Sequence, residues 1–228
     1  MHLGEPKKRQ SDIAYDGLRT AIIRAELMPG AAIDERQCME MLGVGRTPLR
    51  EALQRLAQED LLLAVPQRGY FISSTSAADF FHLNEFRLHS EALAARMAAM
   101  RIDDTQLAEF DALMDEARTG VTERRMEVEW HLGIDERMHK LVARASGNPY
   151  LVQSLNRLYA LSLRSLYVAR VPVTLIFDEL ENFTAIRDAL AARDPDRAEA
   201  AMREHLTMSA VQMVRPVEVP VSMKAAGL

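Results

Sequence analysis

The stretch that decides the fold is Gly43-Val-Gly-Arg-Thr-Pro-Leu-Arg-Glu-Ala-Leu-Gln-Arg-Leu56. It is typical of a tight turn followed by a helix. Gly43 can adopt the left-handed conformation that ends a preceding helix. Thr47 is a favourable N-cap, and Pro48 at the first helical position loses no hydrogen bond. The predicted helix presents one apolar face, made of Leu49, Ala52, Leu53 and Leu56.

Two arginines, Arg46 and Arg50, lie at the amino end of this helix and off its apolar face. A helix of this kind, preceded by a turn and another helix, is how helix-turn-helix proteins enter the major groove of DNA. An ordinary amphipathic helix with two solvated arginines would have the same spacing, because short motifs recur by chance. The spacing alone therefore leaves both interpretations open.

The flanking sequence favours the first interpretation. The segment Arg46-Thr-Pro-Leu-Arg-Glu-Ala-Leu53 is preceded by Met28-Pro-Gly30 and followed by Gln67-Arg-Gly69. In this order the three segments resemble the winged helix-turn-helix of the GntR family of bacterial transcription regulators. Gly45 stands where most members have serine, and Asp60 where most have glycine. Neither change removes a DNA-contacting group, although Gly45 lacks a hydroxyl that could meet a phosphate.

The composition excludes several classes of protein. The 228 residues suffice for one large domain or two modest ones, and 48% hydrophobic with 27% charged residues is typical of a globular chain. A single cysteine, Cys38, excludes an internal disulfide and a zinc finger and fits a reducing cytosol, so we expect a cytoplasmic protein. No apolar run approaches the ~20 residues that span a membrane. The N-terminus has no apolar core behind Lys7-Lys-Arg9, so no signal peptide is expected.

The charge is unevenly distributed along the chain. The net charge is −5, yet residues 1–75 contain ten Lys/Arg and ten Asp/Glu and are neutral as a group. DNA binding must therefore depend on where a few arginines point, and on two copies of the site. We expect a homodimer whose contacts come mainly from the winged-helix part or its junction with the remainder of the chain.

The N-terminal part predicts two further helices and a hairpin. Ser11 can cap a helix that runs to about Glu26, and Asp34 can cap the next one. Residues 61–65 and 70–72 have the composition of short strands, and the loop between them makes a hairpin, the expected wing. The residues predicted to face inward are Tyr15, Leu18, Ile22, Cys38, Met39 and Leu42.

After a polar run the chain becomes rich in alanine and leucine, with almost no strand signals. Ser76 and Asp79 form a capping-box pattern that opens a long helix. Helices are predicted at about 77–100, 104–119, 121–145, 149–169, 173–192 and 195–214, with Gly120 as one of the breaks. Six helices with short loops predict an antiparallel bundle in a mainly α protein. The predicted organisation is a flexible N-terminus (1–10), a winged helix-turn-helix (11–73), a linker (74–76), a helical effector-binding domain (77–214) and a flexible tail (215–228).

This second part resembles the all-helical ligand-binding (FCD-type) domain of the FadR-like GntR subfamily. The resemblance is carried by Arg87 and Glu91, by Asp135 to His139 with Ala145-Ser-Gly-Asn148 after it, and by Met202-Arg-Glu-His-Leu206. Six helices look more like the VanR-type branch than the seven-helix FadR type. The resemblance covers most of residues 78–212 and is looser than that of the DNA-binding part.

Six residues form the predicted DNA-contact set. Arg46 and Arg50 can each reach a guanine edge with two donors, while Thr47 and Arg36 are placed for phosphates. Arg68 suits the minor groove or its flanking backbone, and Gly69 beside it allows a close approach. The alternative for each arginine is a solvated surface charge. The family resemblance implies these roles, which the geometry of the predicted helix and wing allows.

The resemblance also implies a metal site. Asp135 and His139 are four residues apart on one helical face, and with His205 they match three ligand positions of the subfamily. A carboxylate and imidazoles suit zinc, nickel or manganese. The family's fourth ligand is a histidine, and here that position holds Phe183, which cannot ligate and is expected to enter the same space.

Other readings of these polar residues remain open. His131 lies one turn before Asp135 and could substitute for the missing ligand, whereas His82 and His89 are expected on the surface. Without the resemblance, two histidines and an aspartate are usually polar bundle residues with hydrogen-bond partners. If no metal binds, the two histidines would instead donate to an anionic effector.

A small carboxylic acid is the effector that the arginines favour, because a guanidinium pairs best with a carboxylate. Arg87 and Arg164 are the candidates to meet it. The alternative for Arg87 is an intramolecular pair with Glu91 one turn on, and Arg157 and Arg170 are expected to be solvated.

The sequence and the family resemblance therefore predict a ligand-responsive transcription regulator that binds palindromic double-stranded operator DNA as a dimer. We expect it to be a repressor. One alternative is a metal-dependent hydrolase, but no His-Glu-x-x-His, nucleophile elbow or phosphate-binding loop is present. Another is a protein-binding winged helix, which would more naturally expose apolar anchors than arginines. A salt titration of duplex binding separates these classes, because only phosphate neutralisation gives a steep loss.

Overall fold

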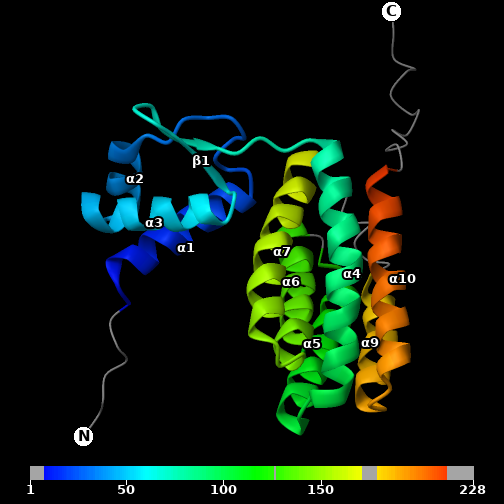
Figure 1. Ribbon diagram of the computed structural model, residues 1–228. Coiled ribbons are helices and arrows are strands. Elements are labelled where there is room, and N and C mark those ends of the chain that lie inside the picture. Colours follow the sequence, from blue (N-terminus) through cyan, green and yellow to red (C-terminus); the bar gives the residue numbers. More distant parts are fainter. Residues whose placement is uncertain (1–7, 126, 171–178, 215–228) are drawn as a thin grey trace, which may run out of the picture.

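The computed structural model describes residues 8–125, 127–170 and 179–214. A small winged-helix part lies beside the upper half of an elongated helical bundle, and one extended segment near residues 73–76 connects them (Figure 1). The flexible tail predicted for 215–228, and most of the flexible N-terminus predicted for 1–10, lie outside the described residues. No helix among the described residues combines the length and the hydropathy needed to cross a membrane.

The winged-helix part has the predicted elements. Its helices are α1 (Gln10–Ile23), α2 (Glu35–Leu42) and α3 (Arg46–Gln58), and its strands are β1 (Leu62–Val65) and β2 (Gly69–Ile72). The strands pair antiparallel, from Leu62 opposite Ile72 to Val65 opposite Gly69. Asp34 caps α2 by accepting the Gln37 amide at 3.0 Å, and Gly43 ends α2 with φ of 64°, both as predicted.

Two predicted helix starts are each wrong by two residues. α1 begins after Arg9 and not after Ser11, because the Arg9 carbonyl already accepts the Asp12 amide at 3.0 Å. α3 begins after Gly45 and not after Thr47, because the Gly45 carbonyl accepts the Leu49 amide at 3.2 Å. Pro48 still lies in the first turn, where a missing amide costs no hydrogen bond. α1 also ends at Ile23, before the predicted Glu26.

A third extended segment, absent from the predicted elements, runs beside β2. The amide of Gly30 donates to the Ile72 carbonyl at 2.9 Å, and the Ile72 amide donates to the Ala31 carbonyl at 2.8 Å. The Ile33 amide donates to Tyr70 at 2.8 Å. These bonds tie the connection between α1 and α2 to the wing and satisfy the outer edge of β2.

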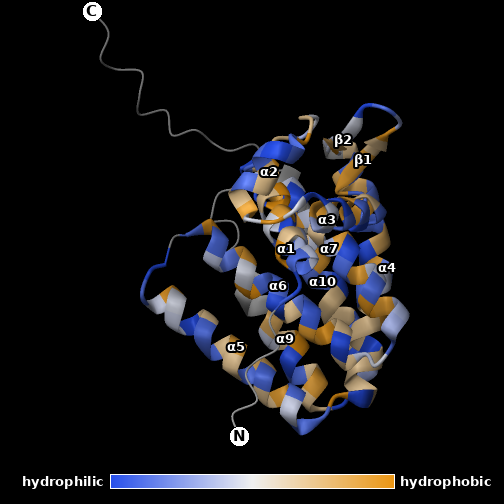
Figure 2. Ribbon diagram, turned by 90° about the vertical axis from the view of Figure 1, so that its left-hand side faces the viewer, coloured by the Kyte–Doolittle hydropathy of each residue, from blue (hydrophilic) through white to orange (hydrophobic). Residues whose placement is uncertain are grey.

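The bundle contains six helices among the described residues. They are α4 (Ala77–Arg101), α5 (Asp104–Thr122), α6 (Val128–Ala145), α7 (Pro149–Ala169), α9 (Glu179–Ala191) and α10 (Pro195–Val214). The predicted capping box is present, since Ser76 and Asp79 exchange side chain-to-backbone hydrogen bonds. The predicted helix 173–192 is described only from Glu179 onward, and its earlier residues lie outside the described ranges. Along these helices hydrophobic and hydrophilic residues alternate, as helices with one buried face require (Figure 2).

The predicted break at Gly120 is wrong. α5 continues through Gly120 to Thr122, and α6 begins only at Val128. A Cβ atom on Gly120 would lie 2.0 Å from the Trp130 ring. The glycine is therefore needed to make room for this ring and does not end the helix. A glycine inside a helix often has such a packing reason.

The two larger of the three hydrophobic clusters among the described residues fill the two parts of the chain. One fills the bundle, with fully buried Phe110, Met138 and Phe183 among its members. The other fills the winged helix and continues into the bundle through Tyr159 and Leu163 of α7. The two parts therefore share one apolar contact region, which sets how the winged helix rests on α7.

Candidate DNA interface and metal centre

The recognition helix separates apolar and charged residues as predicted. Its apolar face is completely buried, since Leu49, Ala52, Leu53 and Leu56 are each 0% exposed. Arg46 and Arg50 lie on the exposed side. The Nε of Arg50 lies 3.2 Å from a carboxylate oxygen of Glu35 on α2, an exposed pair that phosphates or bases can displace at small cost.

The other predicted DNA contacts are also exposed. The Arg36 side chain is 81% exposed, with a loose ion pair to Glu40 at 3.9 Å. Thr47 is exposed in the first turn of α3. At the wing tip Arg68 and Gly69 are exposed, and Gly69 has φ of 88°, a conformation that favours glycine. All six predicted residues are thus accessible on the winged-helix part.

Three predicted metal ligands lie together inside the bundle. Asp135 and His139 come from α6 and His205 comes from α10, and all three are buried. The Nε2 atoms of the two histidines are 3.1 Å apart. The Oδ1 atom of Asp135 lies 3.6 Å from His139 Nε2 and 3.9 Å from His205 Nε2. The helical spacing of α6 and the packing of α10 against the bundle therefore bring three ligand atoms to one point.

Phe183 of α9 closes this cluster on another side. Its side chain is 0% exposed, and its ring centroid lies 4.4 Å from that of His205 and 5.4 Å from that of His139. The phenyl ring thus borders both imidazoles, as the sequence comparison of this position with the family predicts. It supplies an apolar wall and no ligand atom.

A second layer of buried polar residues holds the cluster. The Nδ1 atom of His139 pairs with a carboxylate oxygen of Glu91 on α4. The Nε of Arg87 donates to the other Glu91 oxygen at 2.5 Å. Tyr159 of α7 donates its hydroxyl to Asp135. A carboxylate on the far nitrogen of a ligating histidine is the usual arrangement that orients metal-binding imidazoles.

The protonation states of His139, His205 and Asp135 depend on one another. Burial lowers the pKa of His139, but the carboxylates of Glu91 and Asp135 outweigh it and raise the pKa to about 9. For His205, burial and the adjacent charge of His139 lower the pKa to about 3. Burial raises the pKa of Asp135, yet the neighbouring His139 charge dominates and the net direction is downward. A protonated His139 that donates from Nε2 to a neutral His205 is consistent with the 3.1 Å contact.

The donor set fits a divalent metal. The Oδ1 atom of Asp135 has no hydrogen-bond partner among the described residues, although it is buried. Tetrahedral ligands about 2.1 Å from an ion lie roughly 3.4 Å apart, and the three observed separations of 3.1, 3.6 and 3.9 Å bracket that value. One carboxylate and two imidazoles would hold zinc, nickel or manganese by three protein ligands.

The remaining histidines do not complete the site. His131 does not substitute for the missing ligand, because its Nε2 lies 2.7 Å from the Arg125 carbonyl and it stands outside the three-residue cluster. His82 and His89 are exposed on α4, as predicted. The fourth ligand position is therefore not filled by a histidine of the described residues.

The candidate effector arginines differ in their partners and in their exposure. Arg87 forms the intramolecular pair with Glu91, the alternative that the sequence left open. Arg164 is only 3% exposed and lies near the linker, away from the metal cluster's hydrogen bonds. Arg157 is exposed, as expected, and it pairs with Asp60 across the junction with the winged helix. Arg170 is exposed, as expected.

Two supporting residues were not assigned these roles from the sequence. Glu91 was read as a partner of Arg87, but its contact with His139 depends on the packing of α4 on α6. Tyr159 stands on α7, 24 positions from Asp135, and no local spacing connects them. A buried tyrosine hydroxyl needs a partner, which was the one available signal.

Comparison with known proteins identifies the class of protein to which this chain belongs. Residues 10–72 match the model described as bacterial regulatory proteins, gntR family, and residues 82–208 match the FCD domain. The chain belongs to the GntR family of regulators with an FCD domain, and is a DNA-binding transcription regulator and not an enzyme.

Individual relatives agree with this assignment. The HTH-type transcriptional repressor GlaR of Escherichia coli K12 is 30% identical over 203 residues, covering 84% of this chain and 90% of that protein. The repressor RspR of the same organism is 26% identical, covering 84% and 83%. The solved structure of E. coli McbR/YncC has a TM-score of 0.79 with 20% identity and covers 90% of this chain and 97% of its own, a likeness of fold.

Proposed function

We propose that this regulator is a ligand-responsive repressor that binds a palindromic operator as a homodimer and responds to a small organic acid. The supporting observation is a recognition helix whose arginines are exposed opposite a wholly buried apolar face. The same chain carries a buried cluster of metal-ligand side chains in the domain that its family uses for effectors. The relatives GlaR and RspR are named repressors, which supports the direction of regulation.

In the proposed complex α3 enters the major groove. Arg46 and Arg50 read base edges, and Thr47 and Arg36 contact phosphates. Arg68, with Gly69 beside it, lies against the minor groove or its flanking backbone. Since residues 1–75 carry no net charge, two copies of this interface are needed for useful affinity.

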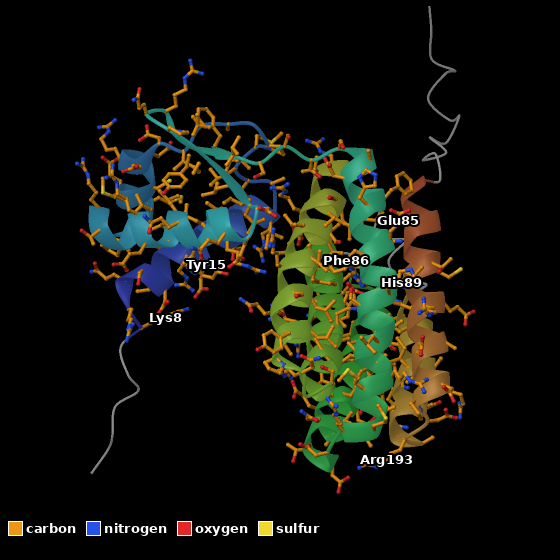
Figure 3. All side chains as sticks on the ribbon, in the orientation of Figure 1. Lys8, Tyr15, Glu85, Phe86, His89 and Arg193 are labelled. Carbon is orange, nitrogen blue, oxygen red and sulfur yellow. The ribbon has the colours of Figure 1, made fainter. Side chains whose placement is uncertain are left out.

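Beside the dimer contacts predicted in the winged-helix part or at its junction, the exposed face of α4 is a proposed dimer contact. Phe86, Leu93 and Met100 are spaced by seven residues and are 57%, 46% and 53% exposed. Phe86 stands on this face with Glu85 and His89 (Figure 3). A row of large apolar side chains on one helix is typical of a surface that a second helix covers. Leu93→Glu should therefore convert dimer to monomer in analytical ultracentrifugation, and an unchanged dimer would contradict this surface.

A metal held by Asp135, His139 and His205 is the proposed cofactor. Three protein ligands leave coordination positions for water or for an effector carboxylate. The metal would hold α6 and α10 together, since its ligands come from both helices. A buried metal also stabilises the fold that forms its site. The VanR-type branch, proposed from six helices, stays a prediction.

DNA binding by the exposed arginines can be tested directly. Duplexes selected by the native protein from a random library should bind with a steep loss of affinity as salt rises, because several phosphates are neutralised. Arg46→Ala and Arg50→Ala should each cost ~1–3 kcal/mol and relax base preference, whereas Arg36→Ala should weaken all sequences equally. Fluorescence anisotropy of a labelled duplex measures these affinities.

Arg118→Ala is the matched control, because Arg118 is 63% exposed on α5 and far along the chain from the winged helix. It should bind DNA as the native chain does. If Arg46→Ala and Arg50→Ala both retain native affinity, the role of α3 as the recognition helix is wrong.

A further inference from the structure

A cavity of about 440 Å³ lies at the junction of the two parts of the chain. It is bounded by the linker residues Ser73–Thr75, by the first turns of α4 and by the second half of α7. Leu83, Phe86, Leu158 and Leu161 supply its apolar lining. Its volume is within the usual range of small-ligand pockets, and its apolar walls are typical of them.

Arg164 lines this cavity and is incompletely paired. Its side chain donates from Nη2 to the Ser74 carbonyl at 3.2 Å. Its Nε and Nη1 atoms are buried and have no hydrogen-bond partner among the described residues. A buried charge with unused donors is costly unless something pairs with it. Burial also lowers the pKa of Arg164, which the negative charge of Asp79 only partly opposes.

The acidic residues around the cavity are already engaged. Asp60 pairs with Arg157, and Asp79 closes the capping box with Ser76. No ion pair joins either carboxylate to Arg164 among the described residues. Arg164 therefore lines the cavity with a guanidinium that keeps two buried donors without partners among the described residues, and a carboxylate from outside the chain would supply an acceptor.

Among the described residues, the hollow beside the metal cluster offers less space. The hollow against Glu91, His139 and Tyr159 has a volume of about 10 Å³, which is at most the room of one water molecule. The Phe183 ring borders the two histidines, and Arg87 is committed to Glu91.

We propose that the junction cavity binds a small monocarboxylate with a compact apolar body, with the carboxylate on Arg164 and the apolar part against Phe86, Leu158 and Leu161. The site deepens the proposed function, on which it rests, by giving the organic-acid effector a position outside the metal centre. The apolar lining favours a carboxylate over a strongly hydrated phosphate, which would lose its water without replacement.

The position of the cavity connects the ligand to DNA binding. Arg164 already holds the Ser74 carbonyl, and the Thr75 and Ser165 hydroxyls are hydrogen-bonded at 3.1 Å. These contacts attach the linker to α7. A carboxylate that draws the guanidinium toward the cavity changes this attachment, and the linker carries the change to the winged helix. A ligand with different affinity for the two linker positions shifts the population that binds DNA.

The test uses the full-length protein and defined probes. Benzoate, butyrate and hexanoate are the carboxylates, benzamide is the neutral isostere of benzoate, and inorganic phosphate is an anion without an apolar body. Isothermal calorimetry is performed on the native chain, on Arg164→Met and on Leu161→Trp, which fills the cavity and leaves Arg164 intact. Arg170→Met, an exposed arginine near the end of the same helix, is the control. His205→Asn, in the metal cluster, tests the competing site.

At least one carboxylate should bind the native chain. Both cavity variants should weaken this binding at least tenfold, while Arg170→Met binds as the native chain does. Benzamide and phosphate should bind at least tenfold more weakly. The inference is overturned if no carboxylate binds, if phosphate binds as well as the carboxylates, or if His205→Asn abolishes binding that Arg164→Met leaves intact.

DNA binding is measured separately from carboxylate binding. The coupling is supported if the bound carboxylate changes the affinity of the native protein for a selected duplex severalfold. The same carboxylate should leave the duplex affinity of Arg164→Met unchanged. Carboxylate binding without any duplex binding would overturn the proposed function and leave the cavity assignment standing. Duplex binding that no bound carboxylate changes would overturn the regulatory role of the cavity.

Discussion

Arg87 and Arg164 are both buried arginines of the helical domain, 6% and 3% exposed, yet their surroundings differ. Arg87 belongs to a continuous network in which it pairs with Glu91, Glu91 pairs with His139, and His139 contacts His205. Arg164 has one hydrogen bond, to a backbone carbonyl, and two nitrogen atoms without partners among the described residues.

The difference separates a supporting role from a binding role. A buried charge that is fully paired inside the protein stabilises and orients its neighbours. A buried charge that is left partly unpaired raises the free energy of the folded protein until a ligand supplies the missing acceptor. Residue type and burial are the same in the two regions, so only the partners distinguish them.

The largest expected effect is on Arg87. Arg87→Met should lower the free energy of unfolding at pH 7 by ~3 kcal/mol, the low end of the cost of breaking a buried pair, because His139 still faces Glu91. Urea denaturation followed by circular dichroism measures it. Arg118→Met, on an exposed pair, should cost at most ~1 kcal/mol. Equal stability of Arg87→Met and the native chain would show that the network around Glu91 does not depend on Arg87.

A smaller effect is expected on metal affinity. Phe183→His should add the missing ligand, and elemental analysis of protein purified without chelator or affinity metal should find stoichiometric metal in the variant and less in the native chain. Glu91→Gln should weaken zinc binding ~10–100-fold, because it disturbs the carboxylate that orients His139. Glu85→Gln, an exposed change on the same helix, should leave zinc affinity unaltered. Metal absent from both the native chain and Phe183→His would make the cluster a hydrogen-bonded part of the core.

The smallest effect is expected on Arg164. Arg164→Met should change the free energy of unfolding by less than ~1 kcal/mol, because the lost hydrogen bond to Ser74 is offset by removal of buried, unpaired donors. The same urea experiment gives this value beside that of Arg87→Met. Destabilisation as large as that of Arg87→Met would mean that Arg164 has a structural partner, and the contrast between the two arginines would fail.

Features that depend on neighbours in the chain were predictable from the sequence. The buried face of α3, the Asp34 cap, the left-handed Gly43 and the capping box of Ser76 and Asp79 all follow from residues within a few positions of one another. Helical periodicity and capping act over one or two turns, which is why local patterns predict them. The family resemblance added the three metal-ligand positions, of which local spacing connects only Asp135 and His139.

Features that depend on contacts between distant segments required the tertiary structure. Gly120 is read locally as a break, but it lies inside α5 because Trp130 packs against it. The sequence left Arg87 open between a ligand and Glu91, and left Arg164 without a neighbour. The contact of Glu91 with His139 depends on the packing of α4 and α6, and the unpaired donors of Arg164 depend on the packing of α7 and the linker. The free energy of a buried charge is set by the groups within a few ångströms of it, and those groups come from segments far apart in the chain.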